Sequence, residues 1–303
     1  MNNIKNSFSI KDLENLSGIK AHTIRIWEKR YNVLEPERTQ TNIRQYDTSS
    51  LQKLLNITLL HHHGYKISKI SKYPPEKIPM LVRQIINEKS VKNHAISAFK
   101  MAMLNFDPAQ FHKAYEDLLS EKSFREIFYD VFIPLITEIG LLWQSDTITP
   151  AHEHFISFLI KQKITSNIEK LQKEGPKIDD RVFVLYLPEN ELHELGLMFV
   201  NYELLEKGFQ TIYLGESIPS DNLPTLNRYF DKITFLSYFT IEPVADEIDA
   251  YIKNVAEKAL TENGEFWILG KQVAEIDRSK LSNKVKLFPS IRSMTDEINT
   301  IVP

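Results

Sequence analysis

The hydrophobic period changes once along the chain. Between about residues 8 and 173, apolar residues recur every three or four positions, which is the spacing of amphipathic helices. From residue 181 onward, short apolar runs alternate with helical stretches, as strands and helices do in βαβ units. The pattern therefore predicts a helical N-terminal part followed by an α/β part.

Residues 8–30 predict two short helices joined by a tight turn. Ser9 is placed to cap the first helix, with Asp12 three residues later, and Gly18 ends this helix. A second helix is expected from about residue 20 to 30, which completes a helix-turn-helix. An ordinary amphipathic surface helix fits this spacing equally well. Donors suited to phosphates and base edges lie on the second helix, at His22, Thr23, Arg25 and Arg30.

The remaining segments predict a linker, a helix bundle and a sheet. Tyr73–Pro79 contains three prolines and is typical of a stiff linker, and Met80–Lys173 carries the apolar stripes of a bundle. The later alternation predicts an open parallel sheet, whose ligands bind beyond the carboxyl ends of its strands. No Gly-x-Gly-x-x-Gly follows the first strand, which disfavours a dinucleotide site. The five expected strands are 181–188, 211–214, 232–238, 265–270 and 284–289.

Composition narrows the possible chemistry. The chain has 303 residues, enough for two or three domains, and no cysteine, which excludes disulfides and thiolate metal sites. Residues 1–78 hold 13 Lys and Arg against 7 Asp and Glu, so this segment carries +6 and the remainder −9 of the net charge of −3. A basic head fits phosphate binding. The apolar runs are too short for a bilayer, so we expect a cytoplasmic protein without a membrane partner.

Two constellations carry candidate chemistry. Trp143 is followed after nine residues by Glu153 and His154, and the loop after the first strand carries Glu191 and His193. An indole can cover a planar ligand, and a histidine whose second ring nitrogen meets a carboxylate is a strengthened metal ligand. Each pattern also has a simpler interpretation. The first fits a capping glutamate beside a surface histidine, and the second fits a solvated loop histidine.

The N-terminal residues resemble the MerR family of transcription regulators. The similarity lies in Ser9–Leu13 and Thr23–Tyr31, and it continues through Asn42–Asp47, which resemble the family's wing. The resemblance implies a winged helix-turn-helix over residues 1–73 that binds double-stranded operator DNA. It also implies that Thr23 and Arg25 face the major groove, and that the wing holds the flanking backbone through Arg44 and Tyr46.

The two constellations resemble the corrinoid-binding module of base-off cobalamin proteins. Glu191-Leu192-His193-Glu194-Leu195-Gly196 is similar to the Asp-x-His-x-x-Gly signature, with Glu in place of Asp. The resemblance implies that His193 ligates cobalt and displaces the dimethylbenzimidazole, whose tail enters a pocket beside the sheet. It places Trp143, Glu153 and His154 in a helical cap over the upper ligand. Further expected cobalamin contacts are Glu191, Gly196, Ser237, Thr240 and Gly270, although Leu269 stands where a first glycine is usual.

The order of these parts resembles the CarH and LitR family of light-dependent repressors. The expected fold is multidomain, α and α/β, with a MerR-like head (1–73), a helical-bundle cap (80–174) and a Rossmann-like domain (179–303). The implied function is that of a repressor, not an enzyme, which adenosylcobalamin controls through homo-oligomerisation as a dimer or tetramer. Gln144 replaces a second histidine of that family, so we expect a less stable photoproduct unless His152 or His154 substitutes.

Two other functions remain open at this point. A regulator whose cobalamin site has decayed is suggested by Leu269 and Gln144. A corrinoid carrier or methyltransferase component shares the cap and the histidine loop, but it has no use for the cations at Arg25 and Arg44.

Overall fold

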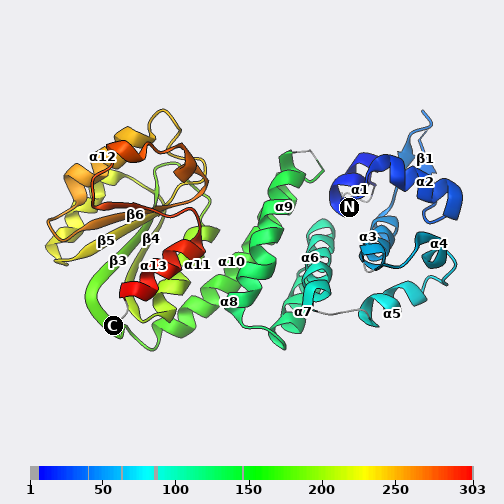
Figure 1. The fold of residues 1–303 in the computed structure, drawn as a ribbon, viewed down its shortest axis with the longest axis horizontal. Coiled ribbons are helices and arrows are strands. Elements are labelled where there is room, and N and C mark those ends of the chain that lie inside the picture. Colours follow the sequence, from blue (N-terminus) through cyan, green and yellow to red (C-terminus); the bar gives the residue numbers. More distant parts are fainter. Residues whose placement is uncertain (1–6, 40, 63, 85–87, 145–146, 302–303) are drawn as a thin grey trace. The chain divides into compact units, whose positions relative to one another are not determined.

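The computed structural model describes residues 7–39, 41–62, 64–84, 88–144 and 147–301 (Figure 1). The chain separates into two compact units, Met1–Leu159 and Ile160–Pro303. Each unit is described by itself below. No helix in the described ranges is both long and apolar enough to cross a bilayer.

The head begins with the two helices that the sequence predicts, α1 (Ile10–Ser17) and α2 (Ala21–Tyr31). The capping box is confirmed, because the backbone N–H of Asp12 donates to the Ser9 side chain and that of Ser9 donates to the Asp12 carboxylate. Gly18 closes α1 at a positive φ of 75°, which glycine adopts without strain. The wing follows as the antiparallel pair β1 (Glu37–Arg38) and β2 (Arg44–Gln45).

The rest of the head is helical: α3 (Thr48–His62), α4 (Ile67–Ile70) and α5 (Lys77–Gln84). The last of these corrects the expected linker, because residues 77–79 form the first turn of α5 rather than an extended connection. Pro79 is tolerated there, since the first-turn N–H groups have no partner within the helix. Burial of Ile78 and Val82 explains why the segment folds onto its neighbours.

The predicted bundle comprises α6 (Glu88–Asn105), α7 (Pro108–Leu119), α8 (Phe124–Ile127), a π-helical turn at Phe128–Phe132, α9 (Ile133–Gln144) and α10 (Pro150–Gln172). Its aromatic stripes form the core, as their spacing predicts. Phe99 packs against Phe111 and Phe132 at ring-centroid distances of 4.9 and 5.6 Å. The helix α10 continues past residue 159 into the second unit.

The second unit contains the five parallel strands that the sequence predicts. They are β3 (Ile178–Pro188), β4 (Phe209–Ile218), β5 (Ile233–Tyr238), β6 (Glu265–Leu269) and β7 (Val285–Leu287), in the order β4-β3-β5-β6-β7. The helices α11 (Leu195–Glu206) and α13 (Ile291–Ile301) cover one face, and α12 (Ile248–Ala259) covers the other (Figure 1). Short 3-10 segments complete the connections at Ser220–Arg228, Lys271–Glu275 and Arg278–Lys280.

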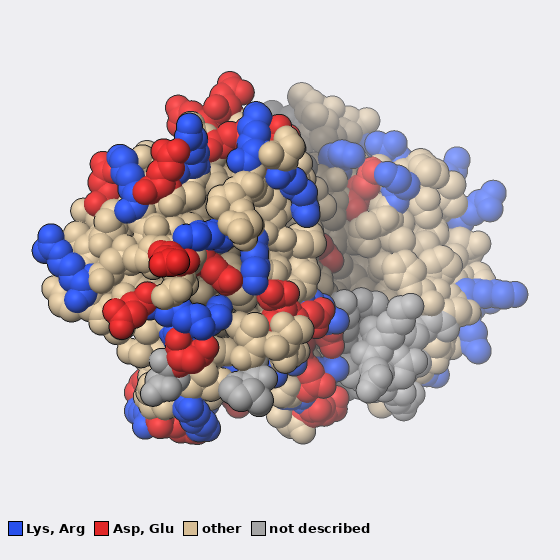
Figure 2. Space-filling model, turned by 60° about the vertical axis from the view of Figure 1, so that its left-hand side comes forward, with Lys and Arg blue, Asp and Glu red and all other residues tan. Residues whose placement is uncertain are grey.

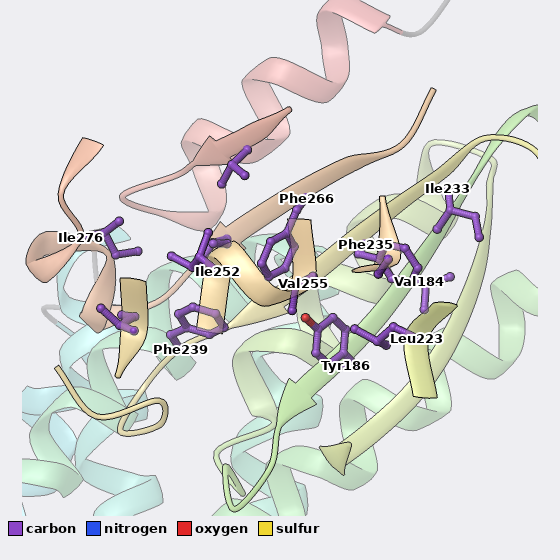
Figure 3. Packing of buried hydrophobic residues seen from close by; sticks show 14 of the residues in the cluster. Val184, Tyr186, Leu223, Ile233, Phe235, Phe239, Ile252, Val255, Phe266 and Ile276 are labelled. Carbon is purple, nitrogen blue, oxygen red and sulfur yellow. The ribbon is translucent and has the colours of Figure 1, made fainter. Parts of the chain in front are cut away.

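The core on the α12 face holds the central strands rigidly. Figure 3 shows Val184 and Phe235 of neighbouring strands in one buried cluster with the helix residues Ile252 and Val255. The strand order reverses between β3 and β5, which pair with each other in the middle of the sheet. Ligands of open α/β sheets bind at such a reversal, beyond the carboxyl ends of the strands. The loops that follow β3 and β5 are therefore the place to look for a site.

Candidate cobalamin site and DNA-binding head

The loop after β3 brings Glu191 and His193 together. The Nδ1 atom of His193 lies 2.6 Å from Oε1 of Glu191, whose side chain is only 1 % exposed, whereas that of His193 is 54 % exposed. With the carboxylate ionised, Nδ1 carries the proton and donates to it, which leaves Nε2 as the ring nitrogen that suits a metal. The pairing expected from the sequence is therefore formed.

Glu191 also joins this loop to the one after β5. Its Oε2 atom accepts hydrogen bonds from the backbone N–H groups of Thr240, Ile241 and Glu242, at 3.0, 2.7 and 3.0 Å. Burial raises the pKa of Glu191, but the hydrogen bonds from His193, Ile241 and Glu242 outweigh burial and lower the pKa to about 2. The carboxylate stays ionised at neutral pH and fixes both loops at the strand reversal.

The surroundings suit a large ligand that brings most of its own metal ligands. Across the described residues, no group of three or more His, Cys, Asp or Glu is placed to hold a bare ion. A single histidine fits a macrocyclic metal complex better, because the macrocycle fills the remaining coordination positions. Exposed apolar side chains on the same two loops, Leu192, Ile241 and Val244, offer a surface for such a ring.

Near the carboxyl ends of β5 and β6, two glycines allow other parts of the chain to pack closely against their backbone. A Cβ atom on Gly196 would lie 2.7 Å from the ring of Tyr238. Gly270 has a φ of 109°, and a Cβ there would lie 2.2 Å from the carbonyl oxygen of Phe239. Both glycines are thus needed for packing within the chain, and contact with a cofactor remains a prediction for each.

Ser237 and Thr240, at and after the end of β5, make different kinds of hydrogen bond. The hydroxyl of Ser237 is buried and donates to the carbonyl oxygen of Tyr186 at 2.9 Å, whereas Thr240 gives its backbone N–H to Glu191. Cofactor contact by either side chain stays a prediction. Sequence reasoning overlooked Tyr238, although an aromatic residue between Ser237 and Phe239 at the end of a buried strand was a visible signal.

In the bundle, Trp143 lies on a different helix from Glu153 and His154. Trp143 is 52 % exposed near the end of α9, and Glu153 and His154 lie in the first turns of α10. Glu153 accepts a hydrogen bond from Ser157 at 2.8 Å and lies 3.5 Å from His154 Nδ1. Within the described part of the chain, no hydrogen bond joins Trp143 to this pair.

Of the two histidines that the sequence offers as replacements for the missing ligand at Gln144, only one is accessible. His152 is buried and stacks on Phe106 with a ring-centroid distance of 4.6 Å, whereas the side chain of His154 is 80 % exposed. Replacement of the missing ligand by His154 remains a prediction. The side chain of Gln144 lies outside the described residues.

On the head, α2 presents His22, Arg25 and Arg30 to solvent, and Thr23 is half-buried beside them. The wing is joined to this helix by Glu28, a residue whose role the sequence did not reveal. Arg44 Nε donates to Glu28 Oε2 at 3.0 Å, and the buried Tyr46 donates its hydroxyl proton to Oε1. Tyr46 therefore supports the position of the wing from inside the head, and phosphate contact by Arg44 and Tyr46 remains a prediction.

Figure 2 shows acidic and basic side chains interspersed over the left-hand part of the view, so no broad surface of one sign forms on that part.

Comparison with known proteins finds family matches for the head and for the helix bundle. Residues 8–77 match the MerR HTH family of regulatory proteins, and residues 95–166 match the B12 binding domain. The chain is 27% identical over 224 residues to the HTH-type transcriptional repressor CarH of Myxococcus xanthus, covering 72% of this chain and 73% of that one. It is 23% identical over 219 residues to the repressor CarA of the same organism, covering 70% and 69%.

A solved structure extends the similarity in fold. The Methanosarcina barkeri monomethylamine corrinoid protein superimposes with a TM-score of 0.56 and 13% identity, over 72% of this chain and 100% of that chain. At this identity the likeness concerns the fold alone. With the MerR head on α1 and α2 and the B12 binding domain on the bundle, the chain is a MerR-type regulator that carries a cobalamin-binding module.

Proposed function

We propose that this chain is a transcription repressor whose operator binding is controlled by adenosylcobalamin. The observation that carries the proposal is the Glu191–His193 pair at the strand reversal, in a chain that also has a MerR head. The relatives CarH and CarA of Myxococcus xanthus bear the name of transcriptional repressor, which supports the direction of regulation.

In the proposed complex, His193 would hold the cobalt of the corrinoid through Nε2. Glu191 keeps the proton on Nδ1 and raises the basicity of Nε2, and the loop after β5 is held in place by the same carboxylate. Trp143 would cover the upper ligand, with Glu153 and His154 available to hydrogen-bond its ribose. Bound adenosylcobalamin supplies a cobalt–carbon bond that light can break.

The head supplies the DNA contacts. Arg25 and Thr23 on α2 would meet the major groove, and His22 and Arg30 would meet phosphates beside it. The ion pair between Arg44 and Glu28 fixes the wing against α2, so that both elements engage the duplex together.

Control would operate through assembly. A ligand that binds one oligomer better than the monomer shifts the equilibrium towards that oligomer, and two linked heads on adjacent half-sites bind DNA more tightly than one. We propose a dimer or tetramer in the dark with adenosylcobalamin, and dissociation in green light.

The test measures mass and DNA binding on the same sample. The full chain is incubated in darkness with adenosylcobalamin, its mass is measured by light scattering, and operator duplexes are selected from a random pool with and without the cofactor. A rise in mass and in DNA affinity that green light reverses supports the proposal. Unchanged mass and affinity would oppose it.

A regulator with a decayed cobalamin site is the second candidate. It is favoured by two bulky side chains, Leu269 and Tyr238, near the carboxyl ends of β5 and β6. Equal operator affinity with and without adenosylcobalamin, together with no retained corrinoid, would establish it.

A further inference from the structure

The space beside the start of α11 is filled by one side chain. The ring of Tyr238 faces Gly196 so closely that a Cβ atom there would lie 2.7, 2.8 and 3.1 Å from three of its carbons. Gly196 lies three residues after His193, in the segment that follows β3, and Tyr238 is the last residue of β5. The contact therefore joins the segments at the ends of the two strands between which the strand order reverses.

A second bulky side chain lies on the same face of the sheet. Tyr238 pairs with Leu269 in the parallel register between β5 and β6, and paired residues of neighbouring strands point to the same face. Leu269 is fully buried and Tyr238 is half-buried. The two side chains together occupy the α11 side of the sheet just below the histidine loop.

The ring of Tyr238 is held by packing. Its hydroxyl makes no hydrogen bond within the described residues, and burial raises its pKa above the usual tyrosine value. Leu269, by contrast, is fully buried in the interior. Of the two side chains, the half-buried Tyr238 is the one that can turn towards solvent.

The resemblance to base-off cobalamin proteins implies that the displaced dimethylbenzimidazole tail of a bound cobalamin would need space beside the sheet. Gly196 at the start of α11 lies three residues after His193, so the space that Tyr238 fills is next to the loop that would hold the cobalt. Resting on the proposed function, we propose that Tyr238 is a specificity-determining residue that occupies the path of this tail. The site thereby favours corrinoids without a bulky lower nucleotide over complete cobalamin.

The test compares two corrinoids that differ in the tail. Binding of aquocobalamin and of tail-free diaquocobinamide to the full chain is measured by absorbance titration. Wild type is expected to bind cobinamide at least tenfold more tightly than cobalamin. Tyr238→Ala is expected to raise cobalamin affinity at least tenfold and to leave cobinamide affinity within twofold. Tyr229→Ala removes an exposed tyrosine of the same unit and serves as the matched control.

The outcomes separate this proposal from the proposed function. If Tyr238→Ala leaves cobalamin affinity unchanged or weakens it, Tyr238 does not block the tail, although His193 can still bind a corrinoid. If no variant binds either corrinoid, both proposals fail together. Circular dichroism checks folding, and Tyr238→Val, which places a residue of high strand propensity at the strand end, repeats the comparison if the alanine variant unfolds.

Discussion

Replacing Glu191 with glutamine should destabilise the second unit in a pH-dependent way. The change keeps the size of the side chain but removes the charge that accepts hydrogen bonds from His193 and from three backbone N–H groups after β5. The amide NH2 of glutamine would face at least one of these donors, since only one of its two end atoms accepts. Buried donors without an acceptor cost free energy of folding.

The magnitude follows from the pKa of the carboxyl. A pKa that falls from 4.5 to about 2 on folding corresponds to about 3 kcal/mol of stability at neutral pH. The folded-state pKa is the lower one, so this contribution is fully present above pH 4.5 and is lost as the pH falls from 4.5 towards 2. The difference between wild type and Glu191→Gln should therefore be about 3 kcal/mol at pH 7 and shrink below pH 4.5.

Urea unfolding of the full chain, followed by circular dichroism at pH 7 and at pH 3, measures this difference. Hydrogen exchange of the amides at Ile241 and Glu242 reports the loop directly, because both donate to the carboxylate. Glu189→Gln changes an exposed glutamate two residues away and is the matched control. Equal unfolding midpoints for wild type and Glu191→Gln at pH 7, or a difference that does not depend on pH, would refute the reasoning.

Three further predictions concern the head, the sheet and the cap. Arg30→Ala should weaken DNA binding and reduce the slope of log affinity against log salt by about 1, because this side chain is proposed to meet a phosphate, and fluorescence anisotropy measures the slope; an unchanged slope would contradict this contact. Gly270→Ala should lower stability by about 3 kcal/mol or more in thermal unfolding, because its Cβ would overlap Phe239, whereas Gly140→Ala, with nothing within 4 Å, should not destabilise. His154→Ala should abolish any bis-imidazole photoproduct spectrum, and its survival would exclude His154 as the replacement ligand.

Much of the fold could be predicted because local signals and hydrophobic period agreed. The capping box at Ser9 and Asp12 and the turn at Gly18 form as expected, and the β3–α11–β4 unit follows its alternating pattern. The expected linker at residues 73–79 was partly wrong, because proline content argued for an extended chain, whereas burial of Ile78 and Val82 favours a helix. Burial by distant residues is not visible in a local pattern.

In the candidate site, too, contacts within one loop could be predicted from the sequence, whereas contacts between distant segments could not. The pairing of Glu191 with His193 was predictable, since only one residue separates them in the same loop. The three N–H groups after β5 that share this carboxylate were not, because they come from a loop about 50 residues away whose position depends on strand order. The same dependence conceals the contact of Tyr238 with Gly196 and that of Glu28 with Arg44.

The most direct test of the central claim asks whether His193 holds a corrinoid. Wild type and His193→Ala are mixed with adenosylcobalamin in darkness, passed through gel filtration to remove unbound ligand, and examined by absorbance spectroscopy. The account predicts that wild type retains corrinoid with the spectrum of a histidine-ligated, base-off form and that His193→Ala loses at least nine-tenths of it. Equal retention by both proteins, or a base-on spectrum in wild type, would contradict the account.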